Sequence, residues 1–208
     1  MIINRENIAT ALGNKLPGAK SHRKMLPPNR VLKATPQTKD RVKQSSVLLL
    51  LFKENNELKA CLIKRTANMK YHAGQIALPG GKIEKDENAI ETALRETYEE
   101  IGVEPDKITI LGKLSEFYVE VSRFEIQPIV GWLQNRPVFK TNRDEVEKVI
   151  VFPLKKMKSP FCEVEMNTVT GRMKVPCINF DNEIIWGATA MILAEFSDLL
   201  SQNFSTWE

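Results

Sequence analysis

The sequence contains little cysteine and no long apolar run. Its three cysteines, Cys61, Cys162 and Cys177, lie far apart among 208 residues and form no C-x-x-C pair. Neither a disulfide framework nor a zinc site is therefore indicated. The longest apolar run, Val47 to Phe52, is far shorter than the roughly 20 residues of a membrane-spanning helix. Because the N-terminus also lacks a signal-peptide core, we expect a soluble protein of the reducing cytoplasm, without a membrane partner.

The chain also lacks a strong charge bias. Its net charge of +4 comes from 30 basic and 26 acidic residues that are well mixed. A nucleic-acid partner is therefore not required, whereas a small anionic substrate such as a phosphorylated metabolite fits this mild bias. The length suits one domain with appendages, and it leaves a homodimer open.

The first forty-odd residues differ in composition from the rest. They are rich in Pro, Lys, Arg and Asn, and two dipeptides, Pro17-Gly18 and Pro27-Pro28, interrupt any helix that starts after Asn4. The composition changes near Ser45, where β-prone runs begin. The predicted division is 1–44 as a partly irregular N-terminal arm, 45–202 as the domain and 203–208 as a tail.

The domain pattern mixes strands with two helices. SSVLLLLF, the turn Asn55-Asn56 and LKACLIK predict a β-hairpin. A periodic segment with Asp86 as N-cap and Gly102 as C-cap predicts a helix. Further strands are expected at ITILGKL, FEIQPIVGWL, KVIVFPL, CEVEMN and MKVPCINF, and a helix around 188–200. This order indicates a mixed α/β sandwich.

Three glutamates share one face of the periodic segment. Glu96, Glu99 and Glu100 stand at i, i+3 and i+4, so their carboxylates are neighbours on a helix. Like charges at this spacing cost a few tenths of a kcal/mol per pair, and a divalent cation would reverse that cost. Mg²⁺ prefers such oxygen ligands together with phosphate oxygens. The alternative is an ordinary solvated helix face, which the spacing alone does not exclude.

The surrounding residues favour the metal interpretation. The segment GKIEKDENAIETALRETYEEIGV resembles the Nudix box, G-x5-E-x7-R-E-U-x-E-E-x-G-U, in which U is aliphatic. Thr97 departs from the pattern, but its methyl group can still pack inward. The matching positions are Gly81, Glu87, Arg95, Glu96, Glu99, Glu100, Gly102 and Val103.

This resemblance implies a Nudix-type α/β/α sandwich with a mixed β-sheet and a hydrolase that uses Mg²⁺ or Mn²⁺ against a diphosphate. By position, Glu96 and Glu100 would be the main metal ligands and Glu99 a further one. The Gly81 carbonyl would also face the metal, and Arg95 would orient the glutamates. Glu87 would support the loop or reach an outer metal shell.

The base that activates water varies within the superfamily. Glu145, just before a predicted strand, is a candidate, and an exposed loop acid is the alternative.

The segment directly upstream of the box indicates a substrate. ACLIKRTANMKYHAGQIALPGG resembles the second motif of coenzyme A diphosphatases, which cleave coenzyme A to 3′,5′-ADP and 4′-phosphopantetheine. Lys70 replaces an arginine of that motif, so it offers a point charge instead of a bidentate fork. The positions that would contact substrate are Arg65, Lys70, Gly74 and Gly80.

Three alternatives stay open at this point. Arg65 and Lys70 could be solvent-facing cations, and the substrate could be ADP-ribose, a nucleotide sugar or a dinucleoside polyphosphate. A non-catalytic nucleotide-binding Nudix module is a further alternative. Such modules typically lose glutamates of the box, whereas all three are present here.

Overall fold

The computed structural model describes residues 3–28, 30–32, 36, 42–69, 72–168, 171–205 and 207. Its first strands form the predicted hairpin. β1 (Lys43–Glu54) and β2 (Glu57–Arg65) pair antiparallel, from Leu51 opposite Ala60 to the turn. Asn55 and Asn56 both have positive φ, as a two-residue turn of type I′ requires. The sequence prediction of this hairpin is confirmed.

The main sheet is mixed because β1 pairs in parallel with β7 (Phe124–Trp132), while its other pairings are antiparallel. The strand order is β3-β2-β1-β7-β5, with β4 beside β1, β6 beside β7 and β8 beside β2. The remaining bounds are β3 (Ile76–Ala77), β4 (Gly80–Lys82), β5 (Thr109–Lys113), β6 (Phe117–Val119) and β8 (Val146–Pro153).

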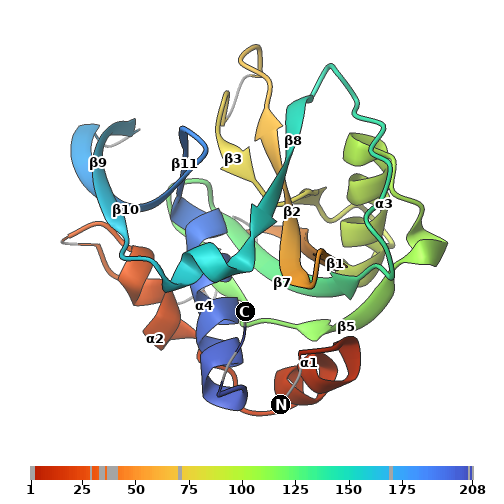
Figure 1. Ribbon diagram of the computed structural model, residues 1–208. Coiled ribbons are helices and arrows are strands. Elements are labelled where there is room, and N and C mark those ends of the chain that lie inside the picture. The colour runs from red at the N-terminus through yellow and green to blue at the C-terminus, as the bar shows by residue number, and fades with distance from the viewer. Residues whose placement is uncertain are drawn as a thin grey trace.

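Helices cover both faces of this sheet. In β1, Leu48 and Leu50 pack into the core on the side of α3 (Ala89–Ile101), whereas Leu49 and Leu51 pack into the core on the side of α4 (Gly187–Asn203). Burial on both faces explains the continuous apolar run of this strand. Figure 1 shows α3 and α4 on opposite sides of the sheet. The predicted α/β/α sandwich is confirmed. None of the described helices is both long and apolar enough to cross a membrane.

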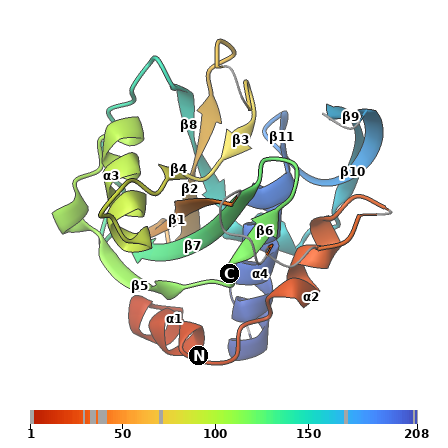
Figure 2. The same ribbon diagram turned by 180° about the vertical axis from the view of Figure 1, so that it is seen from behind.

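The N-terminal segment packs closely against the predicted domain. It forms α1 (Arg5–Leu12), α2 (Ala19–His22) and a 3-10 turn, η1 (Arg23–Met25). Figure 2 shows α1 below β5 and α2 beside α4. Ile8 and Met25 are buried in the same core as α4, and His22 Nε2 lies 2.8 Å from Glu195 Oε2 in the interior. The boundary between arm and domain at residue 44 stays a prediction. Residues from both sides of this boundary belong to the same hydrophobic core.

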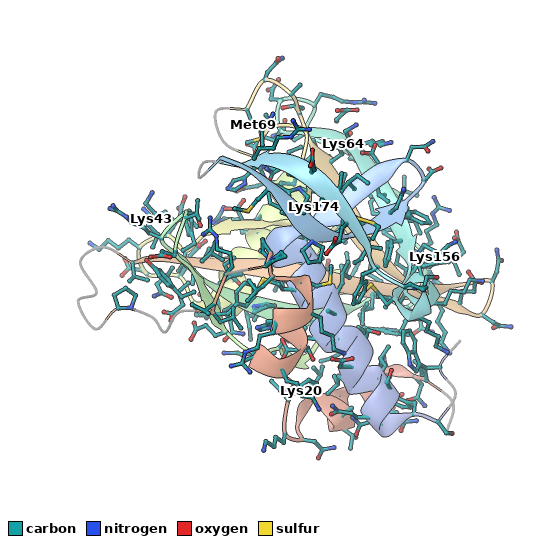
Figure 3. All side chains as sticks on the ribbon, turned by 90° about the vertical axis from the view of Figure 1, so that its left-hand side faces the viewer. Lys20, Lys43, Lys64, Met69, Lys156 and Lys174 are labelled. Atoms are coloured by element: carbon teal, nitrogen blue, oxygen red, sulfur yellow. A yellow bond between two sulfur atoms is a disulfide. The ribbon has the colours of Figure 1, made fainter. Side chains whose placement is uncertain are left out.

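A second, three-stranded sheet stands beside the first. It consists of β9 (Cys162–Thr168), β10 (Gly171–Phe180) and β11 (Glu183–Trp186) in the order β11-β10-β9. Glu183 binds Lys64 of β2 at 3.1 Å and Lys148 of β8 at 2.8 Å, which ties this sheet to the main one. Lys64 is labelled at this edge in Figure 3. Short 3-10 turns, η3 (Pro105–Lys107) and η4 (Leu154–Lys158), complete the described elements.

The second sheet corrects the expectation drawn from the cysteines. Cys162 and Cys177 face each other across the β9–β10 ladder and form a disulfide. Their separation of 15 residues in sequence concealed this pairing, because an antiparallel hairpin brings distant residues directly opposite each other. The absence of a disulfide was therefore a wrong prediction, and it no longer supports a reducing compartment. Cys61 is a free, buried core residue.

The start of α3 also corrects a prediction. Asn88, not Asp86, is the N-cap: its side chain accepts hydrogen bonds from the backbone N–H groups of Ile90 and Glu91, and Glu91 binds the Asn88 N–H in return. Asp86 instead occupies a turn with a φ of 69°. Asp and Asn are both good caps, so composition alone did not separate them. The predicted C-cap, Gly102, is confirmed with a φ of 69°.

Replacing the cap should weaken the fold measurably. Asn88→Ala removes the side chain that satisfies two free N–H groups of α3, and we expect the free energy of unfolding to fall by about 1 kcal/mol. Asp86→Gly is the matched control, because glycine tolerates a positive φ, and its effect should stay within about 0.5 kcal/mol. Urea denaturation measures both. A larger loss for Asp86→Gly than for Asn88→Ala would contradict this assignment.

Candidate metal centre

The three glutamates of α3 differ widely in exposure. The side chain of Glu99 is 53% exposed, that of Glu96 is 17% exposed and that of Glu100 only 2%. A solvated helix face would leave all three in water. Two of the three carboxylates are instead enclosed by neighbouring segments, so the solvated-face alternative fits Glu99 alone.

Glu100 is the most enclosed of these acids. One carboxylate oxygen accepts a hydrogen bond from the Gly80 N–H at 3.0 Å, and the other lies 3.3 Å from Arg65 Nη1. Burial nevertheless raises the pKa of Glu100 to about 8, because these two donors only partly replace water. The nearby positive charge does not fully compensate an ionised Glu100, and a divalent cation would add to that compensation.

Glu96 lies against the backbone of the loop before α3. A Cβ atom added to Gly81 would lie 2.3 Å from Glu96 Oε1, so only glycine leaves room for this carboxylate. Gly80 is constrained as well, since a Cβ there would lie 2.4 Å from the Ser46 carbonyl oxygen. Burial raises the pKa of Glu96, and Arg95 opposes that shift. The two glycines thus allow both buried carboxylates to touch the same short strand, β4.

Arg95 connects the remaining acids of the segment. Its Nε and Nη2 donate to the two carboxylate oxygens of Glu87 at 2.6 and 3.1 Å. Its Nη1 lies 3.0 Å from both Glu96 and Glu99. Hydrogen bonds from Arg95, and then from Thr92, lower the pKa of Glu87 to about 2. Arg95 therefore contacts Glu96 and Glu99, two of the three glutamates that it was predicted to orient, and Glu87 anchors the arginine. Glu100 is contacted by Arg65 and Gly80 instead.

The loop that carries Glu145 is attached to the end of α3. The backbone N–H of Asn142 donates to the Glu100 carbonyl at 3.0 Å, and that of Lys140 donates to the Ile101 carbonyl at 2.9 Å. These bonds satisfy carbonyls that a helix end otherwise leaves free. At the other end of the loop, the Thr66 N–H donates to the Glu145 carbonyl at 2.9 Å. The loop is thereby fixed between α3 and the end of β2.

This attachment places the charge of Glu145 near the buried acids. Burial is the main cause that raises the pKa of Glu96 and of Glu100, and the Glu145 charge adds to it in both. Glu145 itself is partly buried. Glu145 was predicted as a candidate from the sequence, whereas Asn142 was not, because Asn142 contacts Glu100 through its backbone and its residue type gives no signal.

The four positions predicted to contact substrate do not all lie together. Arg65 and Gly80 meet Glu100 directly, so the structure brings them together with the glutamates. Gly74 lies in the turn after β2, with a φ of 68° and open space around its Cα. Its N–H donates to the Thr66 carbonyl at 3.3 Å. Lys70 lies outside the described residues.

The donor set fits a hard cation. It consists of carboxylate oxygens, which Mg²⁺ and Mn²⁺ prefer over the nitrogen and sulfur ligands of softer metals. Arg65 and Arg95 hold several of these oxygens, and within the described ranges no three acid, histidine or cysteine side chains converge into a ready-made cage. Mg²⁺ sites typically need only one or two carboxylates, with water and substrate phosphates as the other ligands. The residues present therefore suit a cation shared with a phosphorylated substrate.

Filling the space beside Gly81 should disturb this site selectively. In Gly81→Ala the new methyl group collides with the carboxylate of Glu96 and not with backbone, so we expect the fold to persist and Mn²⁺ affinity to fall by about 10-fold. Lys82→Ala, at the exposed neighbouring position, is the control and should bind Mn²⁺ normally. Calorimetric titration with Mn²⁺ measures the affinity, and circular dichroism checks the fold. Unchanged Mn²⁺ affinity in Gly81→Ala would refute this function for the glycine.

Solved structures with related folds include two at moderate similarity. RenU, a Nudix hydrolase from M. smegmatis, gives a TM-score of 0.56 at 13% identity over 86% of this chain and 94% of its own. The MutT protein from Methanosarcina mazei Go1 gives a TM-score of 0.54 at 19% identity over 81% of this chain and 99% of its own. At these identities the likeness establishes the fold alone.

Sequence comparison gives the family. The profile of the NUDIX domain family matches residues 42–167. The protein named "Uncharacterized Nudix hydrolase NudL" from Pectobacterium atrosepticum is 33% identical over 145 residues, which cover 68% of this chain and 75% of that protein. "Nudix hydrolase 3" from Caenorhabditis elegans is 35% identical over 180 residues, which cover 76% of this chain and 73% of that protein. The chain therefore belongs to the NUDIX domain family and is a Nudix hydrolase.

Proposed function

We propose that this Nudix hydrolase cleaves the diphosphate of coenzyme A or of a derivative, with Mg²⁺ or Mn²⁺ as the cofactor. The products are 3′,5′-ADP and 4′-phosphopantetheine, or the acylated form of the latter. The observation that carries the proposal is the segment from Leu62 to Gly81, which resembles the coenzyme A diphosphatase motif and continues without a gap into the Nudix box. Contacts from Arg65 and Gly80 to Glu100 support it, because they connect this segment to the box.

In this proposal the buried carboxylates are the metal ligands. Glu96 and Glu100 are the main ligands, Glu99 is a further one, and the Gly81 carbonyl is an additional candidate ligand. When bound to these carboxylates, a divalent cation would neutralise charge on the phosphate oxygens and lower the pKa of the attacking water. Arg95 keeps Glu96 and Glu99 in place through its bidentate bond to Glu87, so the carboxylates reorganise little when the substrate arrives.

Glu145 is the proposed base that removes the proton of the attacking water. Its loop is fixed to both Glu100 and Thr66, and its charge acts on the two buried glutamates. Because Glu145 is partly buried on a separate segment, it can contact water at the edge of the carboxylate cluster without being a principal ligand. No covalent nucleophile is needed in this scheme.

The upstream turn is the proposed contact for substrate phosphates. Coenzyme A carries a 3′-phosphate besides its diphosphate, so its recognition needs cationic or backbone donors beyond the cleaved bond. Lys70 and the turn at Gly74 are the positions proposed for this contact. Gly80 contributes indirectly, since its N–H is already bound to Glu100.

A substrate panel tests the proposed activity. With Mg²⁺ or Mn²⁺ we expect the purified protein to convert coenzyme A into 3′,5′-ADP and 4′-phosphopantetheine, identified by mass, and to turn over ADP-ribose, nucleotide sugars and dinucleoside polyphosphates less efficiently. Glu100→Gln, purified in the same way, should be nearly inactive, which excludes a contaminating enzyme. Preferential cleavage of ADP-ribose with coenzyme A left intact would refute the proposed substrate.

A second variant pair tests the base. Glu145→Gln keeps the shape of the side chain but cannot accept a proton, so kcat should fall by about 100- to 10,000-fold while Mn²⁺ affinity is retained. Glu147→Gln, two residues further and facing Lys64, is the matched control and should keep the wild-type kcat. Steady-state kinetics measure both. A fully active Glu145→Gln enzyme would show that another group removes the proton.

A further inference from the structure

Arg65 occupies an unusual position for a residue expected to bind substrate. Its side chain is only 17% exposed, and its Nη1 lies 3.3 Å from a carboxylate oxygen of Glu100. Its Nε is buried and has no hydrogen-bond partner among the described residues. A guanidinium that served mainly as a phosphate contact would present its donor fork to the open side of the site. Here at least one donor is directed at a metal-ligand candidate and another is inaccessible to a ligand.

The two donors around Glu100 act on different oxygens. Arg65 holds Oε1, and the Gly80 N–H holds Oε2. An ionised carboxylate offers about four lone-pair positions, so two hydrogen bonds leave room for coordination. They also restrict the rotation of the carboxylate about its last bond. A ligand held in this way needs less reorganisation when a cation binds.

We infer that Arg65 is a positioning residue that acts through Glu100: it fixes the orientation of this buried carboxylate and balances its negative charge, so that Glu100 is ready to coordinate the divalent cation. This inference rests on the proposed metal role of Glu100. It assigns Arg65 to metal binding, and it leaves recognition of the outer phosphates to other residues.

The neighbouring residue Lys64 provides a matched control. Lys64, which is labelled in Figure 3, precedes Arg65 in β2 but binds Glu183 of the second sheet at 3.1 Å and Glu147 of β8 at 3.3 Å. Both residues are cations on the same strand, and only Arg65 contacts the glutamate helix. An effect that came from the general loss of positive charge near the site would appear in both variants.

The test measures Mn²⁺ binding without substrate. We expect Arg65→Gln to weaken Mn²⁺ affinity by about 10- to 100-fold, Arg65→Lys to restore part of it, and Lys64→Gln to bind Mn²⁺ like the wild type. Calorimetry or electron paramagnetic resonance of Mn²⁺ gives the affinity. Wild-type affinity in Arg65→Gln would overturn the inference, whereas wild-type affinity in Glu100→Gln would overturn the metal role of Glu100 and the inference with it.

Two further measurements separate positioning from substrate contact. In metal-free protein, the effects of Arg65→Gln and Glu100→Gln on unfolding in urea should be non-additive, because each variant removes the same contact. In kinetics, Arg65→Gln should lower kcat, leave KM for the substrate nearly unchanged and keep the ratio of activities on coenzyme A and on its analogue without the 3′-phosphate. Additive effects on unfolding, or a collapse of that ratio with normal Mn²⁺ affinity, would show that Arg65 binds the substrate instead.

Discussion

The site depends on one enclosed carboxylate, that of Glu100. It receives one hydrogen bond from the Gly80 N–H and an ion pair from Arg65, yet burial still raises its pKa to about 8. A buried charge with incomplete compensation is costly, and a protein retains it where the charge has a use. Gly80 of β4 and Arg65, at the irregular end of β2, both contact this side chain. The enclosed position of Glu100 is therefore defined by the contacts of β2 and β4 with the end of α3.

The same end of α3 also holds the loop that carries Glu145. Free carbonyls at a helix C-terminus need donors, and here the backbone N–H groups of Lys140 and Asn142 provide them. The hydrogen bonds that complete the end of α3 thus also hold the loop of Glu145, which lies about 40 residues further along the chain. Thr66 holds the other side of this loop through its N–H and its hydroxyl, which donates to the Asp144 carbonyl at 3.0 Å. The glutamate helix, the loop of Glu145 and the upstream segment are consequently connected through backbone hydrogen bonds.

Much of this arrangement could be predicted from the sequence because it follows from local rules. Two β-prone runs on either side of the Asn55-Asn56 turn predicted the hairpin, and periodicity with Gly102 predicted the helix. The predictions failed or were incomplete where the structure is determined by contacts between residues that lie far apart in the sequence. The disulfide between Cys162 and Cys177 depends on strand register, and the contribution of the N-terminal helices to the core depends on packing against α4. The direction of the Arg65 side chain depends on which face of β2 meets α3, a choice that residue type does not encode.

The contacts of Arg65 and Gly80 also change how the two motifs relate to each other. By resemblance, the Nudix box fixes the reaction and the upstream segment selects the substrate. In the fold, two positions of the upstream segment surround a glutamate of the box, so the segments form one physical unit. A substitution at Arg65 that altered substrate preference would also disturb Glu100, the proposed metal ligand. Divergence in specificity should therefore be easier at positions that do not contact Glu100 than at the strand end that holds it.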